Sequence, residues 1–339
     1  MKLHLTVAAL AIAAAPAMAE TYNMQSAFGT TLPVLGPSAD RFVANVAMLT
    51  DGAVTFEHLG AGELSPPFEI FDNVGVGAIE AGWSFAAYAS GQEPAAALFG
   101  SVPFGGDPLS YIGWLNHGGG IELWRELYEP YNVVPMACGV ILSEAGGWYT
   151  REINAPEDLQ GLNIRIGGLG GAILSKLGAN AMSLPVGEIS TSLETGRLDA
   201  TELSFPLVDR LLGFDKVADY YYFPGWHQPA GFIEFYVNKD LWDSFTDAQR
   251  TAIEVSCNDI NLWTLGVAAG AQAEVLEQFR TGGTDVRRFP DSVLDALRDA
   301  ANEVYAEQSA EDEMFARVIE SYRSYAAAYN EYQDLSALD

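Results

Sequence analysis

Strand-like and helix-like segments alternate regularly through the first hundred residues of the chain. Residues 22–28, 54–59 and 78–85 are short runs rich in apolar side chains, as in strands, whereas residues 37–50 repeat apolar side chains at helical spacing. Strand, helix and strand at these distances predict βαβ units and a largely parallel sheet.

A second set of alternating segments follows the glycine pair at 146–147. Residues 162–166 and 198–203 predict strands, and residues 171–177 and 187–195 predict helices. Glycine follows both helices, as is common at helix ends. The pattern therefore predicts two α/β modules in tandem.

The last third of the chain is predicted to be mostly helical. Thr246 and Gln249 have the spacing of a capping box, and only two isolated glycines interrupt residues 247–280. A helix of that length spans about 50 Å at roughly 1.5 Å per residue, which exceeds one small domain. We therefore expect it to run across both modules, followed by closing helices at 290–307 and 310–335.

Charge and composition narrow the function classes. The chain has 339 residues with 17 Lys and Arg against 45 Asp and Glu, a formal net charge of −28. Such a balance excludes a nucleic-acid binder and argues against an anionic membrane surface as the partner. Apolar residues make up 49% of the chain, enough for a sizeable core.

The N-terminus has the form of a secretory signal peptide over residues 1–19. Lys2 precedes an apolar stretch at 3–15, and Ala17-Met18-Ala19 is a small-residue cleavage site. The apolar stretch is too short to span a membrane. We therefore expect an exported protein that begins at Glu20 and works in the periplasm.

Two cysteines, Cys138 and Cys257, leave two interpretations open. In an oxidising compartment an even pair can form a disulfide, and the alternative is two buried thiols.

Arg165 is the most informative polar residue in the sequence. It ends an apolar strand just before the glycine cluster at 167–171, at the carboxyl end where open α/β sheets bind ligands. Its planar guanidinium suits a carboxylate, although a structural salt bridge would fit the pattern equally well. The sequence contains no G-x-S-x-G, H-E-x-x-H or P-loop motif that would indicate an enzyme.

Three glutamates also stand out. Glu144 precedes the glycine pair, Glu202 lies in a strand-like run, and Glu234 is flanked by large apolar residues. A buried carboxylate needs an arginine or a hard cation beside it. Each residue taken singly could instead lie on a solvated surface.

Five segments together resemble the substrate-binding proteins of tripartite ATP-independent periplasmic (TRAP) transporters, nearest their 2-oxo acid-binding branch. They are SVPFG at 101–105, GWY at 147–149, PEDLQGLNIRIGGLGG at 156–171, LPVGEI at 184–189 and YYYFPGWH at 220–227. The resemblance covers nearly the whole chain after the predicted signal peptide.

The resemblance implies a two-domain periplasmic binding protein fold of the α/β class, with crossover connections and a long helix spanning both domains. Domain I would comprise residues 20–142 and 232–271. Domain II would comprise residues 143–231 and 272–339, including the C-terminal helices. The two domains are expected to close on a ligand.

The resemblance also implies a binding site. Arg165 matches the arginine that pairs with the ligand carboxylate, and a Ca²⁺ or Na⁺ ion would lie beside the ligand. The metal ligands would be Glu144, Glu202, the backbone carbonyl of Leu203, and Glu234. The remaining ligand-binding residues would be Phe104, Trp148, Trp226 and His227. The alternative is that apolar residues at Leu203, Phe205 and Leu207 mark a lost metal site.

The function implied by the resemblance is delivery of an organic acid anion, a 2-oxo acid or a related monocarboxylate, to the membrane subunits of a TRAP transporter. No enzymatic turnover is expected, and a homodimer through the C-terminal helix is a further expectation. Two alternatives stay open: an exported metal-dependent enzyme, and a ligand sensor that presents the acid to a signalling receptor.

Overall fold

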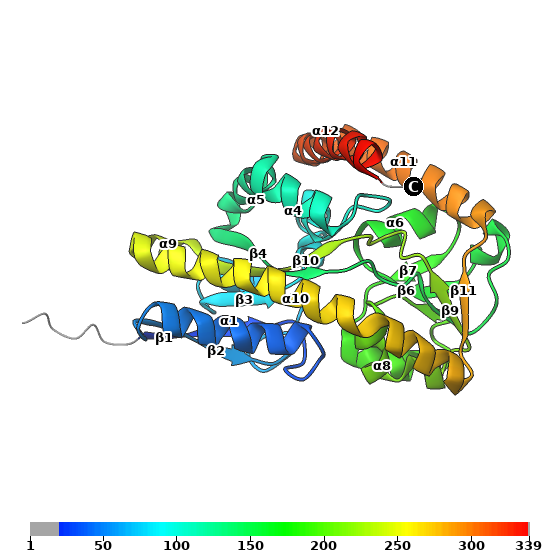
Figure 1. Ribbon diagram of the computed structural model, residues 1–339, viewed down its shortest axis with the longest axis horizontal. Coiled ribbons are helices and arrows are strands. Elements are labelled where there is room, and N and C mark those ends of the chain that lie inside the picture. Colours follow the sequence, from blue (N-terminus) through cyan, green and yellow to red (C-terminus); the bar gives the residue numbers. More distant parts are fainter. Residues whose placement is uncertain (1–19, 338–339) are drawn as a thin grey trace, which may run out of the picture.

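The fold is organised around two β-sheets, seen in a computed structural model that describes residues 20–337 (Figure 1). The signal peptide predicted at 1–19 lies outside the described residues. The first sheet has the order β2-β1-β3-β10-β4 and the second the order β11-β9-β5-β8-β6-β7.

The first sheet consists of β1 (Glu20–Ser26), β2 (Val54–Leu59), β3 (Ala81–Ser84), β4 (Val133–Ile141) and β10 (Gly231–Asn238). The second consists of β5 (Gly147–Tyr149), β6 (Asn163–Arg165), β7 (Asn180–Met182), β8 (Ala200–Thr201), β9 (Tyr220–Phe223) and β11 (Asp285–Arg288).

Both sheets are mixed, so the expectation of largely parallel sheets was wrong. β1 pairs in parallel with β2 and β3, as the βαβ pattern predicted, but β10 runs antiparallel to both β3 and β4. In the second sheet β5 runs antiparallel to β8 and β9. The reason is that β10 and β5 each follow a crossover from the other sheet, and such pairing has no local sequence signal.

Helices flank both sheets. They are α1 (Leu35–Leu49), α2 (Ile70–Gly75), α3 (Ala97–Gly100), α4 (Pro108–His117), α5 (Gly120–Tyr128), α6 (Gly168–Lys176), α7 (Ile189–Glu194), α8 (Pro206–Leu212), α9 (Lys239–Ser244), α10 (Asp247–Gly282), α11 (Asp291–Glu311) and α12 (Glu313–Ser336). Within residues 20–337, no helix combines the length and apolar character needed to cross a bilayer.

The long helix α10 spans the molecule, as predicted (Figure 1). Its start is fixed by the predicted capping box, in which the Thr246 hydroxyl accepts from the backbone of Gln249 and the Gln249 side chain accepts from Thr246. It packs on α1 and β4 beside the first sheet and on α8 and β11 beside the second. The chain also crosses from the first sheet to the second between β4 and β5, and returns between β9 and β10.

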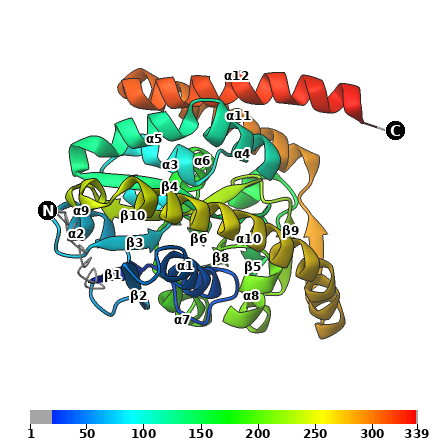
Figure 2. The same cartoon turned by 60° about the vertical axis from the view of Figure 1, so that its left-hand side comes forward.

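The two closing helices lie against different parts of the molecule. α11 packs on α6 beside the second sheet, whereas α12 packs on α4 and α5 beside the first (Figure 2). The family resemblance had implied that both helices belong to the second domain. The physical reason for the difference is the apolar stripe of α12, where Phe315, Val318 and Tyr322 are buried.

A disulfide between Cys138 of β4 and Cys257 of α10 joins the first sheet to the long helix. β4 is an edge strand, and α10 covers that edge with side chains. Gly139 N donates to Asn261 Oδ1 at 2.7 Å, and Val140 N donates to Thr264 Oγ1 at 2.8 Å. The disulfide and these hydrogen bonds together protect the edge strand from pairing with another chain.

We expect the disulfide to contribute about 2–4 kcal/mol to the free energy of unfolding, because it closes a long loop in the unfolded chain. The two cysteines are 119 residues apart in sequence. Urea titration of the double variant Cys138→Ala/Cys257→Ala should give a lower midpoint than the wild-type protein. Wild-type protein treated with a reductant should move to the same midpoint. A midpoint insensitive to reduction would contradict the assignment.

Candidate ligand-binding and metal site

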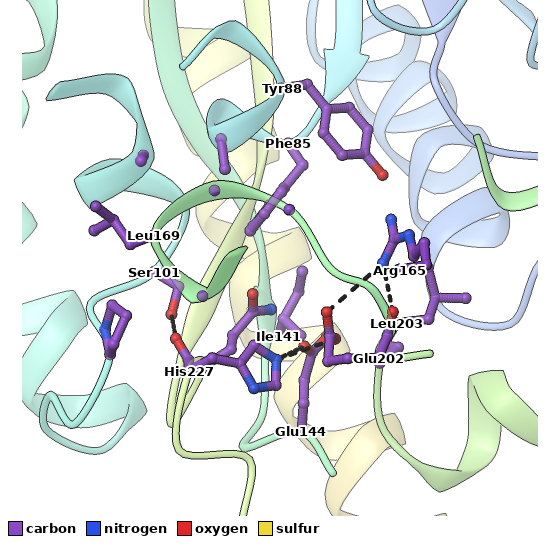
Figure 3. Close-up of a pocket in the computed structure, with 18 of the residues that line it drawn as sticks. Phe85, Tyr88, Ser101, Ile141, Glu144, Arg165, Leu169, Glu202, Leu203 and His227 are labelled. Carbon is purple, nitrogen blue, oxygen red and sulfur yellow. Dashed lines mark hydrogen bonds and ion pairs between the residues drawn. The ribbon is translucent and has the colours of Figure 1, made fainter. Parts of the chain in front are cut away.

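A cavity with an empty volume of about 750 Å³ lies between the two sheets (Figure 3). Its walls are mostly apolar, with a few charged groups gathered on one side. Segments beside the first sheet contribute Phe28, Leu35, Phe85, Ala87, Tyr88, Ala97, Ser101, Pro103 and Ile141. Segments beside the second sheet contribute Glu144, Arg165, Gly167, Gly168, Leu169, Gly170, Val186, Glu202, Leu203, Ser204, His227 and Gln228.

Arg165 lies at the carboxyl end of β6, buried in the wall of this cavity. Its Nη1 donates to the carbonyl of Glu202 at 2.5 Å and lies 3.6 Å from Glu202 Oε2. Its Nε donates to the carbonyl of Leu184 at 3.3 Å. These contacts orient the guanidinium, which is the group that could hold a carboxylate in the cavity.

Glu202 is placed beside Arg165 by the sheet itself. It directly follows β8, which pairs in parallel with β6, and its backbone N donates to the carbonyl of Arg165 at 2.9 Å. Two adjacent parallel strands therefore place an acidic and a basic side chain at the same edge of the sheet.

Glu144 and His227 complete the charged group. His227 Nε2 lies 3.0 Å from Glu202 Oε1 and 3.3 Å from Glu144 Oε2. The loops that carry them exchange backbone hydrogen bonds, from Glu144 N to the Gln228 carbonyl and from Gly225 N to the Glu144 carbonyl. Glycine is required at 225, because a Cβ there would lie 2.3 Å from the Glu144 carbonyl oxygen.

The buried charges shift one another's protonation. Burial raises the pKa of Glu144 well above its usual range, and the charge of Glu202 adds to that effect. Burial opposes ionisation of Glu202, but His227 and Arg165 outweigh it and lower its pKa to about 2. Burial also disfavours the imidazolium of His227, yet contacts with Glu202 and Glu144 raise its pKa to about 9. Without a cation, the favoured state pairs ionised Glu202 with protonated His227 and a neutral Glu144.

Several cavity residues were missed by the sequence analysis, among them Tyr88 and Gln228. Tyr88 directs its hydroxyl toward Arg165 (Figure 3), and burial raises the pKa of that hydroxyl. Gln228 is buried and lines the cavity beside His227. Gln228 directly follows the YYYFPGWH segment, so its position was a usable signal. Tyr88 lies in an alanine-rich turn with no comparable signal.

Glu234, predicted as a metal ligand, is not brought into this group. It is buried on β10 between Ser84 of β3 and Ala137 of β4, and the Tyr128 hydroxyl donates to its carboxylate at 3.2 Å. Burial raises the pKa of Glu234 to about 8, against the effect of the Tyr128 hydrogen bond. Side chains alternate along a strand, and this position faces α5 rather than the cavity.

Three predicted aromatic ligands also lie outside the cavity lining. Trp148 belongs to the core of the second sheet, where it stacks on Tyr221 and its Nε1 donates to Asp209 Oδ2 at 3.0 Å. Trp226 is buried behind His227 and stacks on Phe104, with ring centroids 5.8 Å apart. Leu203, whose carbonyl was predicted as a metal ligand, does line the cavity.

The group formed by Glu144, Glu202 and His227 fits a bound cation. One donor atom from each residue lies within 4.8 Å of the others, and all three side chains are buried. Two adjacent buried carboxylates repel each other unless a proton or a cation lies between them. Carboxylate oxygens are the donors that Ca²⁺ and Na⁺ accept, so Glu144 and Glu202 would hold the ion.

Comparison with known families decides the class of protein. Residues 29–312 match the model of the bacterial extracellular solute-binding proteins, family 7. The chain belongs to this family. Within it, a monocarboxylate 2-oxoacid-binding periplasmic protein of Nostoc sp. is 32% identical over 301 residues, covering 88% of this chain and 83% of the relative.

Solved structures of similar proteins share the fold of this family 7 member. A TRAP transporter solute-binding protein of Bordetella bronchiseptica, with co-purified calcium and picolinate, has a TM-score of 0.91 and 32% identity, covering 93% of this chain and 94% of that one. A TRAP periplasmic solute-binding protein of Pseudoalteromonas atlantica, with bound sodium and pyruvate, has a TM-score of 0.89 and 30% identity, covering 93% and 96%. The predicted two-domain binding-protein fold is thereby confirmed.

We expect the free energy of unfolding of cation-free protein to fall more steeply with pH in the wild-type chain than in His227→Gln. The pKa of His227 is raised from 6.5 to about 9, so its stabilising effect is complete below pH 6.5 and is lost as the pH rises through about 9. The difference should reach on the order of 3 kcal/mol at most, since one pKa unit corresponds to about 1.4 kcal/mol.

Urea titrations in the presence of a chelator, from about pH 6 to about pH 10, measure this difference. His117→Gln is the matched control, because His117 is exposed and has no ion pair within residues 20–337. Parallel curves for the wild-type protein and His227→Gln would mean that the folded protein keeps His227 neutral.

Proposed function

We propose that this chain is a periplasmic receptor for monocarboxylate 2-oxo acids, which it delivers to the membrane subunits of a TRAP transporter. Its role would be binding without turnover, in keeping with the matched family. The observation that carries the proposal is Arg165, a buried guanidinium in the wall of an otherwise largely apolar cavity between two sheets.

Arg165 is suited to a carboxylate ligand because its guanidinium is held in one orientation and still lines the cavity. Its contacts with the Glu202 and Leu184 carbonyls fix the guanidinium plane, and the cavity lies beside it. A carboxylate entering there would be removed from water, where a charge-assisted pair is strongest. The Nostoc relative and the pyruvate-bound neighbour bind ligands of this class.

A cation beside the ligand is part of the proposal. A cation would replace the protons on Glu144 and His227. In that state Glu144, Glu202 and the ligand carboxylate would together carry three negative charges against one on Arg165. A divalent ion balances this excess better than a monovalent ion, so we propose Ca²⁺ held by Glu144 and Glu202. Neighbouring structures contain calcium with picolinate and calcium or sodium with pyruvate.

The apolar wall favours a 2-oxo acid that has an extended apolar side chain. Phe28, Phe85, Leu169 and Leu203 line the cavity together with the ring of Tyr88. Pyruvate, with its single methyl group, would leave much of this surface uncovered. Each buried methylene contributes about 0.8 kcal/mol, so a branched or aromatic side chain should bind more tightly.

We expect 4-methyl-2-oxopentanoate to bind the calcium-loaded protein at least about tenfold more tightly than pyruvate, because three further carbons are buried. Oxaloacetate should bind more weakly than either, because its second carboxylate would meet apolar side chains. Isothermal titration calorimetry on protein refolded free of co-purified ligand measures the series. Equal affinities for all three acids would contradict the assignment of the apolar wall.

We expect Arg165→Ala to weaken binding of every acid in that series by on the order of 2–5 kcal/mol, because the ligand carboxylate loses its partner. Arg165→Lys should recover part of the loss, since it restores the charge without the planar fork. Arg288→Gln is a matched control, because Arg288 is exposed and is not among the residues that line the cavity. Near wild-type affinity in Arg165→Ala would refute the proposed function.

We expect chelator treatment to weaken 2-oxo acid binding, and Ca²⁺ to restore it better than Na⁺ by at least about tenfold. Glu144→Gln should narrow this preference, because it removes one of the negative charges that a divalent ion balances. Glu311→Gln, an exposed change of equal charge, should leave the preference unchanged. Full affinity in chelator with neither ion would show that Arg165 and the apolar wall suffice.

The domain division also stays a proposal, with residues 20–142 and 232–271 forming one domain and residues 143–231 and 272–339 the other. The strand composition of the two sheets supports it, whereas α12 packs beside the first sheet and departs from it. The cavity between the sheets suggests closure on the ligand. We expect the radius of gyration from X-ray scattering to fall when ligand is added. Identical scattering profiles would contradict closure.

A homodimer through the C-terminal helix stays a prediction, which the molar mass from light scattering would test.

A further inference from the structure

A second cavity, with an empty volume of about 860 Å³, lies between the loop at 102–106 and helices α11 and α12. Two arginines line it, Arg298 from α11 and Arg323 from α12, together with the rings of Phe104, Tyr305 and Tyr322. No acidic residue is present among the described residues that line this cavity. It is separate from the charged group around Arg165.

Neither arginine has an acidic partner. Within residues 20–337, no carboxylate oxygen lies within 4.0 Å of the Arg298 or Arg323 guanidinium, although nearby Arg317 pairs with Glu126 at 2.6 Å. The chain has 45 acidic residues against 17 basic ones, so carboxylates are not scarce. Two unpaired guanidinium groups in one cavity therefore give it a local positive charge.

Both guanidinium groups stack on the faces of aromatic rings. The Arg298 guanidinium lies 4.3 Å from the centroid of the Phe104 ring, and that of Arg323 lies 4.6 Å from the centroid of the Tyr305 ring. Stacking on a ring orients an arginine but uses none of its N–H donors, which point outward in the guanidinium plane. These donors stay available to an anion.

The loop that forms the wall of this cavity is tightly constrained. Phe104 has a φ of 56°, in the left-handed region that bulky residues rarely adopt. The Tyr305 hydroxyl donates to the Pro103 carbonyl at 2.9 Å, and Gly106 N donates to the Tyr322 hydroxyl at 2.6 Å. Glycine is required at 105, where a Cβ would lie 2.6 Å from that same hydroxyl. Strain of this kind is concentrated at functional sites.

We propose that this cavity is a second binding site, for a small organic dianion such as a dicarboxylate, held by Arg298 and Arg323. Two guanidinium forks match two carboxylate groups, and the amides of Asn302 and Asn330 add neutral donors at the cavity wall. Pro103 lines both this cavity and the first one, so the two sites share the loop at 102–106. The proposal does not depend on the identity of the ligand bound at Arg165.

Succinate is the probe for this site, titrated into the full chain at constant ionic strength with NaCl as the balancing salt. We expect saturable binding by calorimetry, with nuclear magnetic resonance shifts at 102–106 and along α11 and α12. The double variant Arg298→Gln/Arg323→Gln should weaken succinate binding at least tenfold and leave pyruvate binding unchanged. Arg197→Gln is the control for charge, because Arg197 is exposed and has no ion pair within residues 20–337.

The variant Arg165→Ala separates the two sites, since it should lose pyruvate binding and keep succinate binding. Succinate binding that Arg165→Ala abolishes would place the probe in the first cavity and overturn the proposal. Binding that is absent, or unchanged in the double variant, would overturn it as well. A dimer in light scattering that the double variant loses, without succinate binding, would assign the cavity to a second copy of the chain and have the same consequence.

Discussion

Burial of ionisable side chains is the constraint on which the main cavity depends. Arg165, Glu202, Glu144 and His227 are each less than a tenth exposed, although any one of them alone would be costly to remove from water. They are tolerated because each contacts a partner that has the opposite charge or can share a proton with it. Removing one member leaves another uncompensated, so the four positions act as a unit. A ligand or cation that enters must rebalance the whole group.

The backbone delivers these groups from distant parts of the sequence. β6 and β8 are parallel neighbours, so Arg165 and Glu202 meet at one edge of the sheet. Glu144 and His227 come from the two loops where the chain crosses between the sheets, and these loops are held together by the hydrogen bond from Gly225 N to the Glu144 carbonyl. The crossovers that connect the sheets therefore also build the site, which couples the position of the sheets to the charges between them.

Local signals in the sequence predicted much of this arrangement. The capping box at Thr246 located the long helix, and the strand-end rule located Arg165, whereas the role of Glu202 was implied by the family resemblance. Two residues expected at the site lie elsewhere. Glu234 lies in an apolar run because it is buried beneath α5. Trp148, which the resemblance implied as a ligand residue, packs in a core with its indole N–H on Asp209. Which face of a strand meets the cavity depends on long-range pairing, which local sequence does not encode.

If this chain of net charge −28 binds anions as proposed, the distance and the screening between charges make that possible. At physiological ionic strength, surface charges are screened beyond about 8 Å, so most acidic side chains have little effect on a ligand inside a cavity. Arg165 is buried and acts across a few ångströms with little screening. Arg298 and Arg323 are exposed, and their effect depends on the absence of carboxylates from the described lining of their cavity. In the two proposed sites the overall charge would therefore influence how fast an anion approaches, whereas the three guanidinium groups would determine whether it stays.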